Sequence, residues 1–356
     1  MRILHIAPFN TAGVPFAFVK AERALGHESR LVTLGRHPQD REEDICLDLP
    51  FLDSWLVRRV KGIVTPEHRR VVSHVARLPS KIPPEWKPSP WGESLLINLR
   101  ERVWKKKIEE AIQEHGLYDY DVYQLDGGLE FFRDGRFVRR LKESGKKVIC
   151  CYTGSDLRTR GVIPAIDASS DLNVTVEFDH LQYHPDIHHV PFPLDVDAFQ
   201  PADPAGGHVV RIGHAPTNRA AKGSDIIIPI VQALERRFPV QLVLIEGLPY
   251  SEAIRLKRTC HVFIDQIGDL GYGMNSLEAL AMGIPACSSL APGFAEVYPD
   301  HPFIVVGADT LETELTALIQ DRRLIRKKGK QGRAWVRRVH DARAVVERIH
   351  SLAGCR

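Results

Sequence analysis

The most informative segment of the sequence runs from Asp265 to Pro285, where three glycines precede a helix. A strand ending at Asp265 leads into a loop with Gly268, Gly271 and Gly273, and the helix is expected to start near Ser276, as its N-cap, and to stop before Gly283. Backbone N–H groups in such a loop, together with the positive end of the helix dipole, favour an anion such as a diphosphate.

Glu278 is expected in the first turn of the same helix. A carboxylate there would repel phosphate, so it is better suited to accept hydrogen bonds from sugar hydroxyls. The alternative is that Glu278 only stabilises the helix N-terminus through the dipole.

A second group of residues lies between Gly213 and Gly223, after a strand and before a helix. Ligands bind at this carboxyl edge in parallel sheets, and Arg219 and Lys222 bring two cations to it. Such a pair suits a pyrophosphate clamp that stabilises charge on a leaving group. The sequence contains neither a Walker A motif nor a G-x-G-x-x-G fingerprint.

Alternating strands and helices must position these loops, which predicts an α/β fold with parallel sheets covered on both faces. The length of 356 residues suits two domains. A Pro- and Gly-rich stretch over 190–207 is the expected linker, and the last helical stretch is expected over 324–352. The predicted strands cover 2–6, 28–34, 122–125, 147–151, 172–176, 209–213, 240–246, 262–265 and 286–289, and the other predicted helices cover 14–25, 224–237 and 276–282.

Composition narrows the class of protein. Apolar residues make up 44% and charged residues 26% of the chain, which excludes a disordered or fibrous protein. No apolar run is long enough to cross a bilayer, and the first residues read as a strand rather than a secretion signal. Six cysteines without a C-x-x-C pair, two of them adjacent at Cys150 and Cys151, indicate a reducing compartment. We therefore expect a cytoplasmic protein.

Between Trp55 and Lys107 the chain carries 13 Lys or Arg against four Glu, with four of its five Trp. This composition favours contact with an anionic, partly apolar partner such as a membrane surface. The alternative is an ordinary solvated face. Nucleic-acid binding is not expected because no recognition motif accompanies the charge. His180, His184, His188 and His189 lack zinc-ligand spacing, so no metal site is expected.

Taken together, these motifs resemble the retaining glycosyltransferases of the GT-B fold, of the group called family 4. The resemblance covers nearly the whole chain. Its parts are Ala12–Gly13, Gly154–Arg158, Pro191–Asp195, His214–Arg219 with Lys222–Gly223, and Gly271–Pro285.

The resemblance implies a GT-B fold, with two Rossmann-like domains facing a central cleft and a C-terminal helix crossing back to the first domain. The first domain would cover 1–200 on the acceptor side, with the helix at about 336–356 packing on it. The second would cover 208–335 and bind the nucleotide sugar.

It also implies an activity: retaining transfer of a sugar from a nucleotide diphosphate sugar to a glycan, lipid-linked or small-molecule acceptor, as in polysaccharide biosynthesis. No cofactor or metal is implied. A location at the inner face of the membrane would follow if the acceptor is lipid-linked.

The implied site residues divide by role. Lys222 and Arg219 would neutralise the leaving diphosphate, Glu278 would bind the ribose, and Glu246 would lie near the base. Thr153 and Asp156 would face the acceptor, with Asp156 counted among the catalytic residues. The remaining donor-binding residues would be Gly13, Tyr272, Gly273, Met274, Asn275 and Ser276.

Two positions depart from the family pattern. Leu270 stands where the first of two glutamates, eight positions before Glu278, is usual, and Thr153 stands where a histidine is frequent. The alternative functions are a catalytically silent GT-B protein that only binds a nucleotide sugar, and a sugar-nucleotide epimerase on the same fold.

Overall fold

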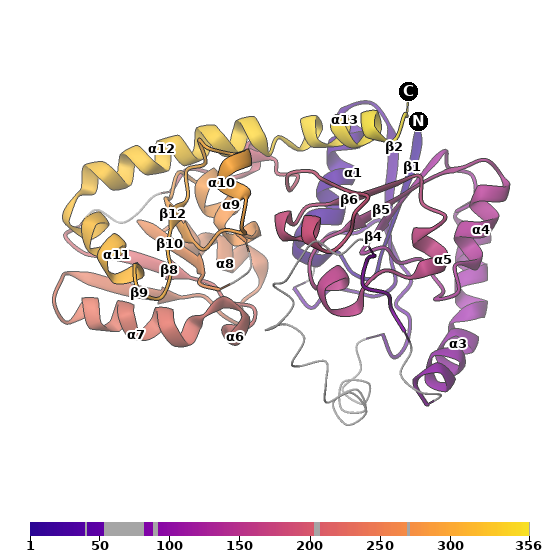
Figure 1. Ribbon diagram of the computed structural model, residues 1–356, viewed down its shortest axis with the longest axis horizontal. Helices are drawn as coiled ribbons and strands as arrows, with labels where there is room; N and C mark the ends of the chain where they lie inside the picture. The colour runs from indigo at the N-terminus through magenta and orange to yellow at the C-terminus, as the bar shows by residue number, and fades with distance from the viewer. Residues whose placement is uncertain (40, 53–81, 88–91, 203–206, 269–270, 356) are drawn as a thin grey trace. The chain divides into compact units, whose positions relative to one another are not determined.

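The chain folds into two α/β units (Figure 1). The computed structural model describes residues 1–39, 41–52, 82–87, 92–202, 207–268 and 271–355. Unit 1 comprises Met1–Pro191 and Arg343–Arg356, and unit 2 comprises Phe192–Ala342. Each unit has its own parallel sheet, which confirms the predicted fold class of two parallel-sheet α/β domains.

Unit 1 is built on a seven-stranded sheet in the order β3-β2-β1-β4-β5-β6-β7, and every pairing is parallel. The central strands are almost entirely buried, because helices cover a parallel sheet on both faces. The strands are β1 (Arg2–Ala7), β2 (Glu28–Thr33), β3 (Ile45–Cys46), β4 (Val122–Asp126), β5 (Lys147–Tyr152), β6 (Leu172–Thr175) and β7 (Ile187–His189).

Helices of unit 1 connect these strands, and the C-terminal helix belongs to the same unit. Gly26 ends the first helix with a φ of 85°, a conformation that glycine adopts without strain. The helices are α1 (Val14–Ala24), α3 (Gly92–Glu114), α4 (Arg136–Glu143), α5 (Pro164–Asp167) and α13 (Ala342–Leu352).

A buried polar network joins the middle of β1 to α1 and α13. The His5 ring contacts Glu22 at 2.9 Å and Asp126 at 3.3 Å, and His350 of α13 lies 3.3 Å from the other Glu22 oxygen. Burial alone would lower the pKa of His5, but the two carboxylates raise that pKa to about 10. The network therefore holds a charged histidine at the centre of the sheet and ties the C-terminal helix to it.

Unit 2 is built on a five-stranded parallel sheet in the order β12-β11-β10-β8-β9. Its strands are β8 (Val210–His214), β9 (Val240–Leu244), β10 (Val262–Gln266), β11 (Ala286–Ser288) and β12 (Ile304–Val305). Its helices are α6 (Arg219–Lys222), α7 (Ser224–Glu235), α8 (Tyr250–Lys257), α9 (Met274–Ala281), α10 (Phe294–Val297), α11 (Leu311–Gln320) and α12 (Arg322–Val339).

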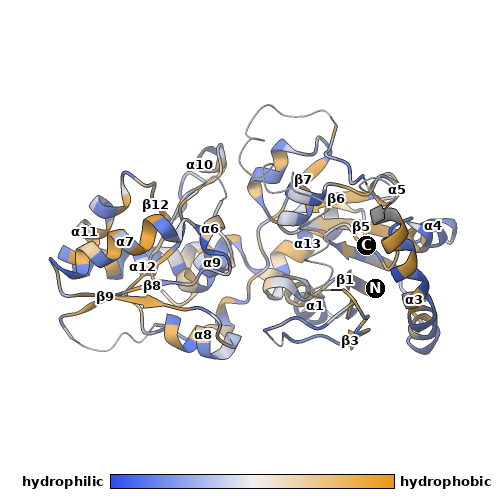
Figure 2. Ribbon diagram, turned by 90° about the horizontal axis from the view of Figure 1, so that it is seen from below, coloured by the Kyte–Doolittle hydropathy of each residue, from blue (hydrophilic) through white to orange (hydrophobic). Residues whose placement is uncertain are grey.

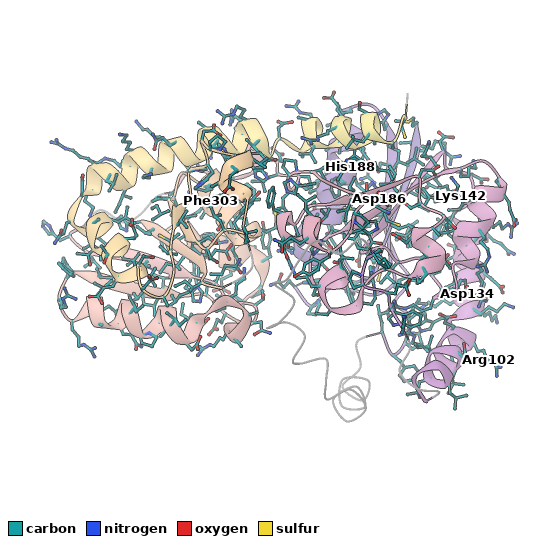
Figure 3. All side chains as sticks on the ribbon, viewed as in Figure 1. Arg102, Asp134, Lys142, Asp186, His188 and Phe303 are labelled. Atoms are coloured by element: carbon teal, nitrogen blue, oxygen red, sulfur yellow. The ribbon has the colours of Figure 1, made fainter. Side chains whose placement is uncertain are left out.

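An aromatic cluster fills the part of unit 2 beside α12. Tyr272 stacks on Phe303, which is labelled in Figure 3, with ring centroids 4.5 Å apart. Phe294 packs on Tyr272 and Trp335 of α12 packs on Phe303. Because Tyr272 is buried in this cluster, its side chain anchors the glycine-rich loop to the core.

The structure corrects two boundaries. The last helical stretch is two helices, since α12 ends at Val339 and α13 begins at Ala342. Buried His340 interrupts them: its Nδ1–H donates to the Phe192 carbonyl at 2.9 Å, and its Nε2 lies 3.3 Å from the Tyr272 hydroxyl. Helix α9 begins at Met274 with Gly273 as its N-cap, so Ser276 is not the N-cap.

Helix α3 presents an apolar stripe to solvent, and Figure 2 shows hydrophilic and hydrophobic residues interleaved along it. Leu95 is 69% and Leu99 58% exposed, whereas Trp104 on the same helix is buried.

Within the described ranges, no helix combines the length and the apolar character that crossing a membrane requires. The predicted basic segment 55–107 lies partly outside the described residues, which omit 53–81 and 88–91.

Candidate functional site

The order of strands in unit 2 defines where a ligand would bind. The chain runs from β8 outward to β9 and then returns to β10 on the other side of β8. Ligands of open parallel sheets bind at the carboxyl ends of the strands, at such a reversal of direction. The loop after β8 carries α6, with Arg219 and Lys222, and the loop after β10 leads into α9. The topology thus brings the two predicted motifs to one edge.

Lys222 and the start of α9 are joined by Asp265, the fourth residue of β10. The Lys222 ammonium lies 2.8 Å from Asp265 Oδ1. The other carboxylate oxygen accepts hydrogen bonds from the Gly273 N–H at 2.8 Å and the Ser276 hydroxyl at 2.9 Å. Burial alone would raise the pKa of Asp265, but Lys222 and these donors hold it below its usual range. Asp265 is therefore ionised and fixes Lys222 against the glycine loop.

Two local features hold α6 in this place. The Asn218 side chain caps the helix by accepting from the Ala221 N–H at 3.2 Å. Gly223 ends it with a φ of 66°, and a Cβ at this position would lie 2.5 Å from the Ile267 carbonyl oxygen. Only glycine fits there, because the turn passes directly against the residue that follows β10.

Arg219 lies in the first turn of α6 and forms a two-pronged ion pair with Glu246, which follows β9. The distances are 2.8 Å and 2.6 Å. The hydrogen bonds from Arg219 lower the pKa of Glu246. The Arg219 side chain is 60% exposed, so it is accessible to an anionic ligand at this edge.

Glu278 lies in the second turn of α9 and is held by a buried lysine. Its carboxylate contacts Lys257 Nζ at 2.5 Å and the Tyr250 hydroxyl at 3.0 Å. Lys257 also donates to the Asn275 side chain at 2.8 Å, and Asn275 donates to the Ala215 carbonyl at 3.0 Å. This arrangement orients Glu278 and Asn275 and connects α8, α9 and the loop after β8.

Sequence reasoning missed Lys257 and placed Asp265 only at the end of a strand. A lysine near the end of a helix is ordinarily solvated, and no sequence signal marks Lys257 as buried. Asp265 did carry a signal, since a carboxylate inside the apolar run Val262–Gln266 needs a partner when it is buried.

The remaining donor-side predictions are placed as follows. Tyr272 is anchored in the aromatic cluster, so only its backbone is available to a ligand. Met274, half-buried, is the first residue of α9. Leu270, at the position of the first glutamate, lies outside the described residues, as does Asp269.

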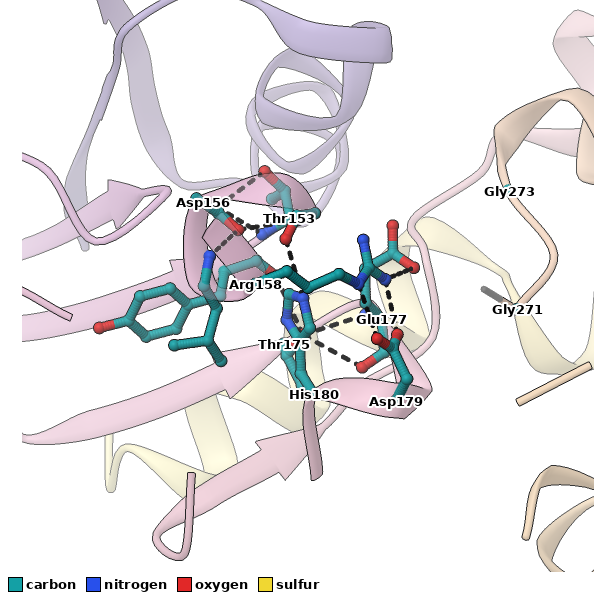
Figure 4. A network of polar contacts seen from close by, with 12 residues as sticks. Thr153, Asp156, Arg158, Thr175, Glu177, Asp179, His180, Gly271 and Gly273 are labelled. Atoms are coloured by element: carbon teal, nitrogen blue, oxygen red, sulfur yellow. Dashed lines mark hydrogen bonds and ion pairs between the residues drawn. The ribbon is translucent and has the colours of Figure 1, made fainter. Parts of the chain in front are cut away.

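In unit 1, Asp156 closes a turn on Thr153. Figure 4 shows its carboxylate directed at the backbone, where it accepts from the N–H groups of Thr153 at 2.8 Å, Gly154 at 2.9 Å and Leu157 at 2.7 Å. Both oxygens of Asp156 are thus engaged in shaping this loop, at the carboxyl end of β5.

Arg158 and His180 connect the same loop to the residues that follow β6 (Figure 4). Arg158 bridges Glu177 and Asp179, at 2.9 Å and 2.6 Å. The His180 Nε2–H donates to the Gly154 carbonyl at 2.9 Å, and burial lowers the pKa of His180 to about 4. His180 is therefore neutral near pH 7 and acts as a fixed donor.

Gly13 lies in unit 1, at the N-cap of α1. Its φ of 76° is the left-handed conformation, and a Cβ here would lie 2.7 Å from an Arg41 guanidinium nitrogen. The structure therefore needs glycine at this position for backbone reasons. Within the described residues, no group of three or more His, Cys, Asp or Glu is arranged to hold a metal ion.

The fold is that of the GT-B glycosyltransferases. Sucrose-phosphate synthase from Thermosynechococcus elongatus matches with a TM-score of 0.62 at 13% identity, covering 99% of this chain and 98% of that one. Staphylococcus aureus TarM matches with a TM-score of 0.61 at 9% identity, covering 99% of both chains. Anabaena Alr3699/HepE in complex with UDP-glucose matches with a TM-score of 0.58 at 11% identity, again covering 99% of both.

No protein-family model matches the chain, and no curated protein matches it. Similarity at 9–13% identity establishes a shared fold. A shared fold does not fix the reaction, which depends on the side chains of the site itself.

Proposed function

We propose that this protein is a retaining glycosyltransferase of the family 4 type that transfers a sugar from a nucleotide diphosphate sugar. The observation that supports it best is Lys222, fixed by buried Asp265 against the first turn of α9. Lysine at a glycine loop and helix N-terminus suits a diphosphate.

The two cations of the site, Lys222 and Arg219, suit the charge that develops during sugar transfer. When the sugar–oxygen bond breaks, negative charge develops on the diphosphate, and a preorganised cation stabilises it without rearrangement. Lys222 is such a cation because Asp265 holds its position, and Arg219 is a second one with an exposed side chain. The N–H groups of Met274 and Asn275 at the start of α9 would add hydrogen bonds to the ligand, whereas those of Ser276 and Leu277 donate to the Gly273 carbonyl.

The rest of the donor would lie along residues already held in place. Glu278 would accept hydrogen bonds from the ribose hydroxyls, with Lys257 holding it in orientation, and Glu246 would lie near the base. The backbone from Tyr272 to Ser276 would hold the sugar and phosphate.

The acceptor would bind to unit 1, near Thr153 and Asp156. Because Asp156 uses both carboxylate oxygens in its own turn, we propose that it shapes the acceptor loop, and that the leaving phosphate takes the acceptor proton. If the leaving phosphate takes the proton, the acceptor attacks from the face that the phosphate leaves. The anomeric configuration is then retained without an enzyme nucleophile.

We propose that the acceptor is a glycan or a lipid-linked molecule. The transfer would take place at the cytoplasmic face of a membrane, during polysaccharide synthesis. The exposed stripe on α3 supports docking to an anionic bilayer. Lys105 and Lys106 follow Leu95 and Leu99 on the same helix, each in an exposed ion pair with a glutamate four residues later that an anionic headgroup could replace.

Sedimentation with vesicles tests this docking. The Leu95→Ser/Leu99→Ser variant should lose binding to anionic vesicles, whereas Val297→Ser, which changes another exposed apolar residue, should keep it. Binding should weaken as salt is raised. Equal binding of both variants, or none to anionic vesicles at low salt, would exclude this surface as a docking site.

The transfer reaction is tested first with UDP sugars, because one structure with this fold is a complex with UDP-glucose. A panel of nucleotides should raise the melting temperature selectively. Donor hydrolysis by the purified protein, with the anomer identified by NMR, should show retention. Nucleotide binding without any turnover over a broad donor and acceptor panel would favour the silent binding protein, and interconversion of donor epimers would favour the epimerase.

A further inference from the structure

Unit 2 contains a cavity of about 780 Å³ at the amino edge of its sheet. Its walls include Gly207, Cys260–His261 and Gly283–Ile284, which lie just before β8, β10 and β11, respectively. The proposed donor site lies at the carboxyl ends of the same parallel strands. The two sites are therefore at opposite edges of the sheet, and neither contributes a residue to the other.

The described residues lining this cavity are strongly basic. Five cations come from α12 alone, at spacings of four, four, three and four residues, which places them along one face of the helix. Among the described lining residues there is no acidic side chain. The cations are Arg322, Arg326, Lys330, Arg333 and Arg337.

Three of these cations are already bonded within unit 2. Arg333 donates to the backbone carbonyls of Phe199 and Ala281. Arg337 pairs with Asp197. Arg322 donates to the His208 carbonyl at 3.0 Å.

Arg326 and Lys330 are different: both are exposed, and neither has a hydrogen bond or ion pair with any described residue. They are four residues apart on α12, where like charges repel and destabilise a helix. An anion between them would convert this repulsion into attraction. The pair thus presents two exposed cations, without a described partner, at the wall of the cavity.

The other lining residues are mostly apolar: Pro201, Ala202, Met282, Ile284, Ile325 and Ala334. A ligand that satisfies both parts of the wall needs a charged end and an apolar body. The volume is in the range of small-molecule sites, and Arg with Lys is a common phosphate-binding combination.

We propose that this cavity binds a phosphate monoester whose organic part is apolar. The proposal does not depend on the proposed transferase activity. The phosphate would lie between Arg326 and Lys330, and the apolar part would lie against Met282 and Ile284. The phosphate could belong to a soluble ester or to a lipid headgroup.

Calorimetric titration of the full chain with n-octyl phosphate, below its micelle concentration, tests the proposal. Arg326→Ala/Lys330→Ala should weaken binding by at least about tenfold, because each lost charged hydrogen bond corresponds to about that factor. The matched control is Arg323→Ala/Lys327→Ala, which removes the same charge from exposed positions of α12 outside the cavity wall, and it should bind like the wild type.

Two further arms locate the ligand and its source. Lys222→Ala should leave octyl phosphate binding unchanged, and inorganic phosphate should bind more weakly than octyl phosphate, by about fourfold for each methylene buried. Binding of the protein to vesicles that contain phosphatidic acid is measured in the same variants. If this binding is lost in Arg326→Ala/Lys330→Ala, the phosphate belongs to a lipid headgroup.

Equal affinity of the cavity variant and its matched control would overturn the proposal. A loss of octyl phosphate binding only in Lys222→Ala would also overturn it, since the ligand would then occupy the donor edge. Failure of the proposed transferase activity would leave these results unaffected.

Discussion

Replacing Lys222 by alanine separates the structural from the catalytic role of the Lys222–Asp265 pair. The change leaves the buried Asp265 carboxylate with two hydrogen bonds, from Gly273 and Ser276, but without its counter-charge. Removing one partner of a buried ion pair costs about 3–5 kcal/mol. Because the Lys222 side chain keeps 18% exposure and the two hydrogen bonds remain, we expect the lower end, about 3 kcal/mol.

That loss corresponds to a fall in melting temperature of about 6–12 °C for a unit of this size. It should also depend on pH. In the wild type the pKa of Asp265 is lowered, so its stabilisation is present above its unfolded-state pKa of about 3.9 and is lost as pH falls through the lower folded value. Without Lys222 this pKa rises, so the difference from wild type should be largest near pH 7 and shrink toward pH 3–4.

Activity should respond differently. Sugar transfer by Lys222→Ala should fall by about 100-fold or more, the typical cost of removing a group that stabilises charge in the transition state. Adding Asp265→Asn removes the unpaired charge, so the double variant should regain most of the melting temperature and none of the activity. Thermal unfolding and initial-rate measurements on the four proteins complete the cycle.

Two results would refute this reasoning. A folded Lys222→Ala protein whose transfer rate is within about threefold of the wild-type rate would show that Lys222 is not part of the donor site. A double variant that is no more stable than Lys222→Ala would show that Asp265 does not depend on Lys222 for its charge.

Three further predictions follow from the contacts. Arg219→Ala should change the melting temperature little, because its ion pair with Glu246 is largely exposed, and should lower the transfer rate, which steady-state kinetics measures. Glu278→Gln should weaken nucleotide binding by about tenfold in calorimetry, and unchanged affinity would leave Glu278 as a partner of buried Lys257 only. The pKa of His5 is raised to about 10, so its stabilisation is complete below its unfolded-state pKa of about 6.5 and is lost as pH rises toward 10. His5→Gln should flatten this alkaline part of the stability profile.

Most of the framework could be predicted from local patterns. The strand at the N-terminus, the helix that Gly26 ends and the apolar runs of β5 and β10 are all where periodicity and glycine positions put them. These elements depend on neighbouring residues only, and a strand buried on both faces must be apolar throughout.

The boundary between α12 and α13 could not be predicted in this way. The periodicity continues through His340, which in isolation favours helix about as well as its neighbours do. The break depends on the Phe192 carbonyl and the Tyr272 hydroxyl, which lie 148 and 68 residues away in the sequence. Tertiary contacts decided it.

The sequence by itself determined the α/β alternation, the glycine loop before α9 and the two cations before α7, because each is a short-range pattern of residue types. Only the tertiary structure showed that Asp265 joins Lys222 to Gly273 and Ser276, and that Lys257 is buried against Glu278. The physical reason is that an ion pair is defined by distance and dielectric, and both are properties of how strands and helices pack. No residue can reveal from its own neighbours in the chain which distant charge will share its low-dielectric surroundings.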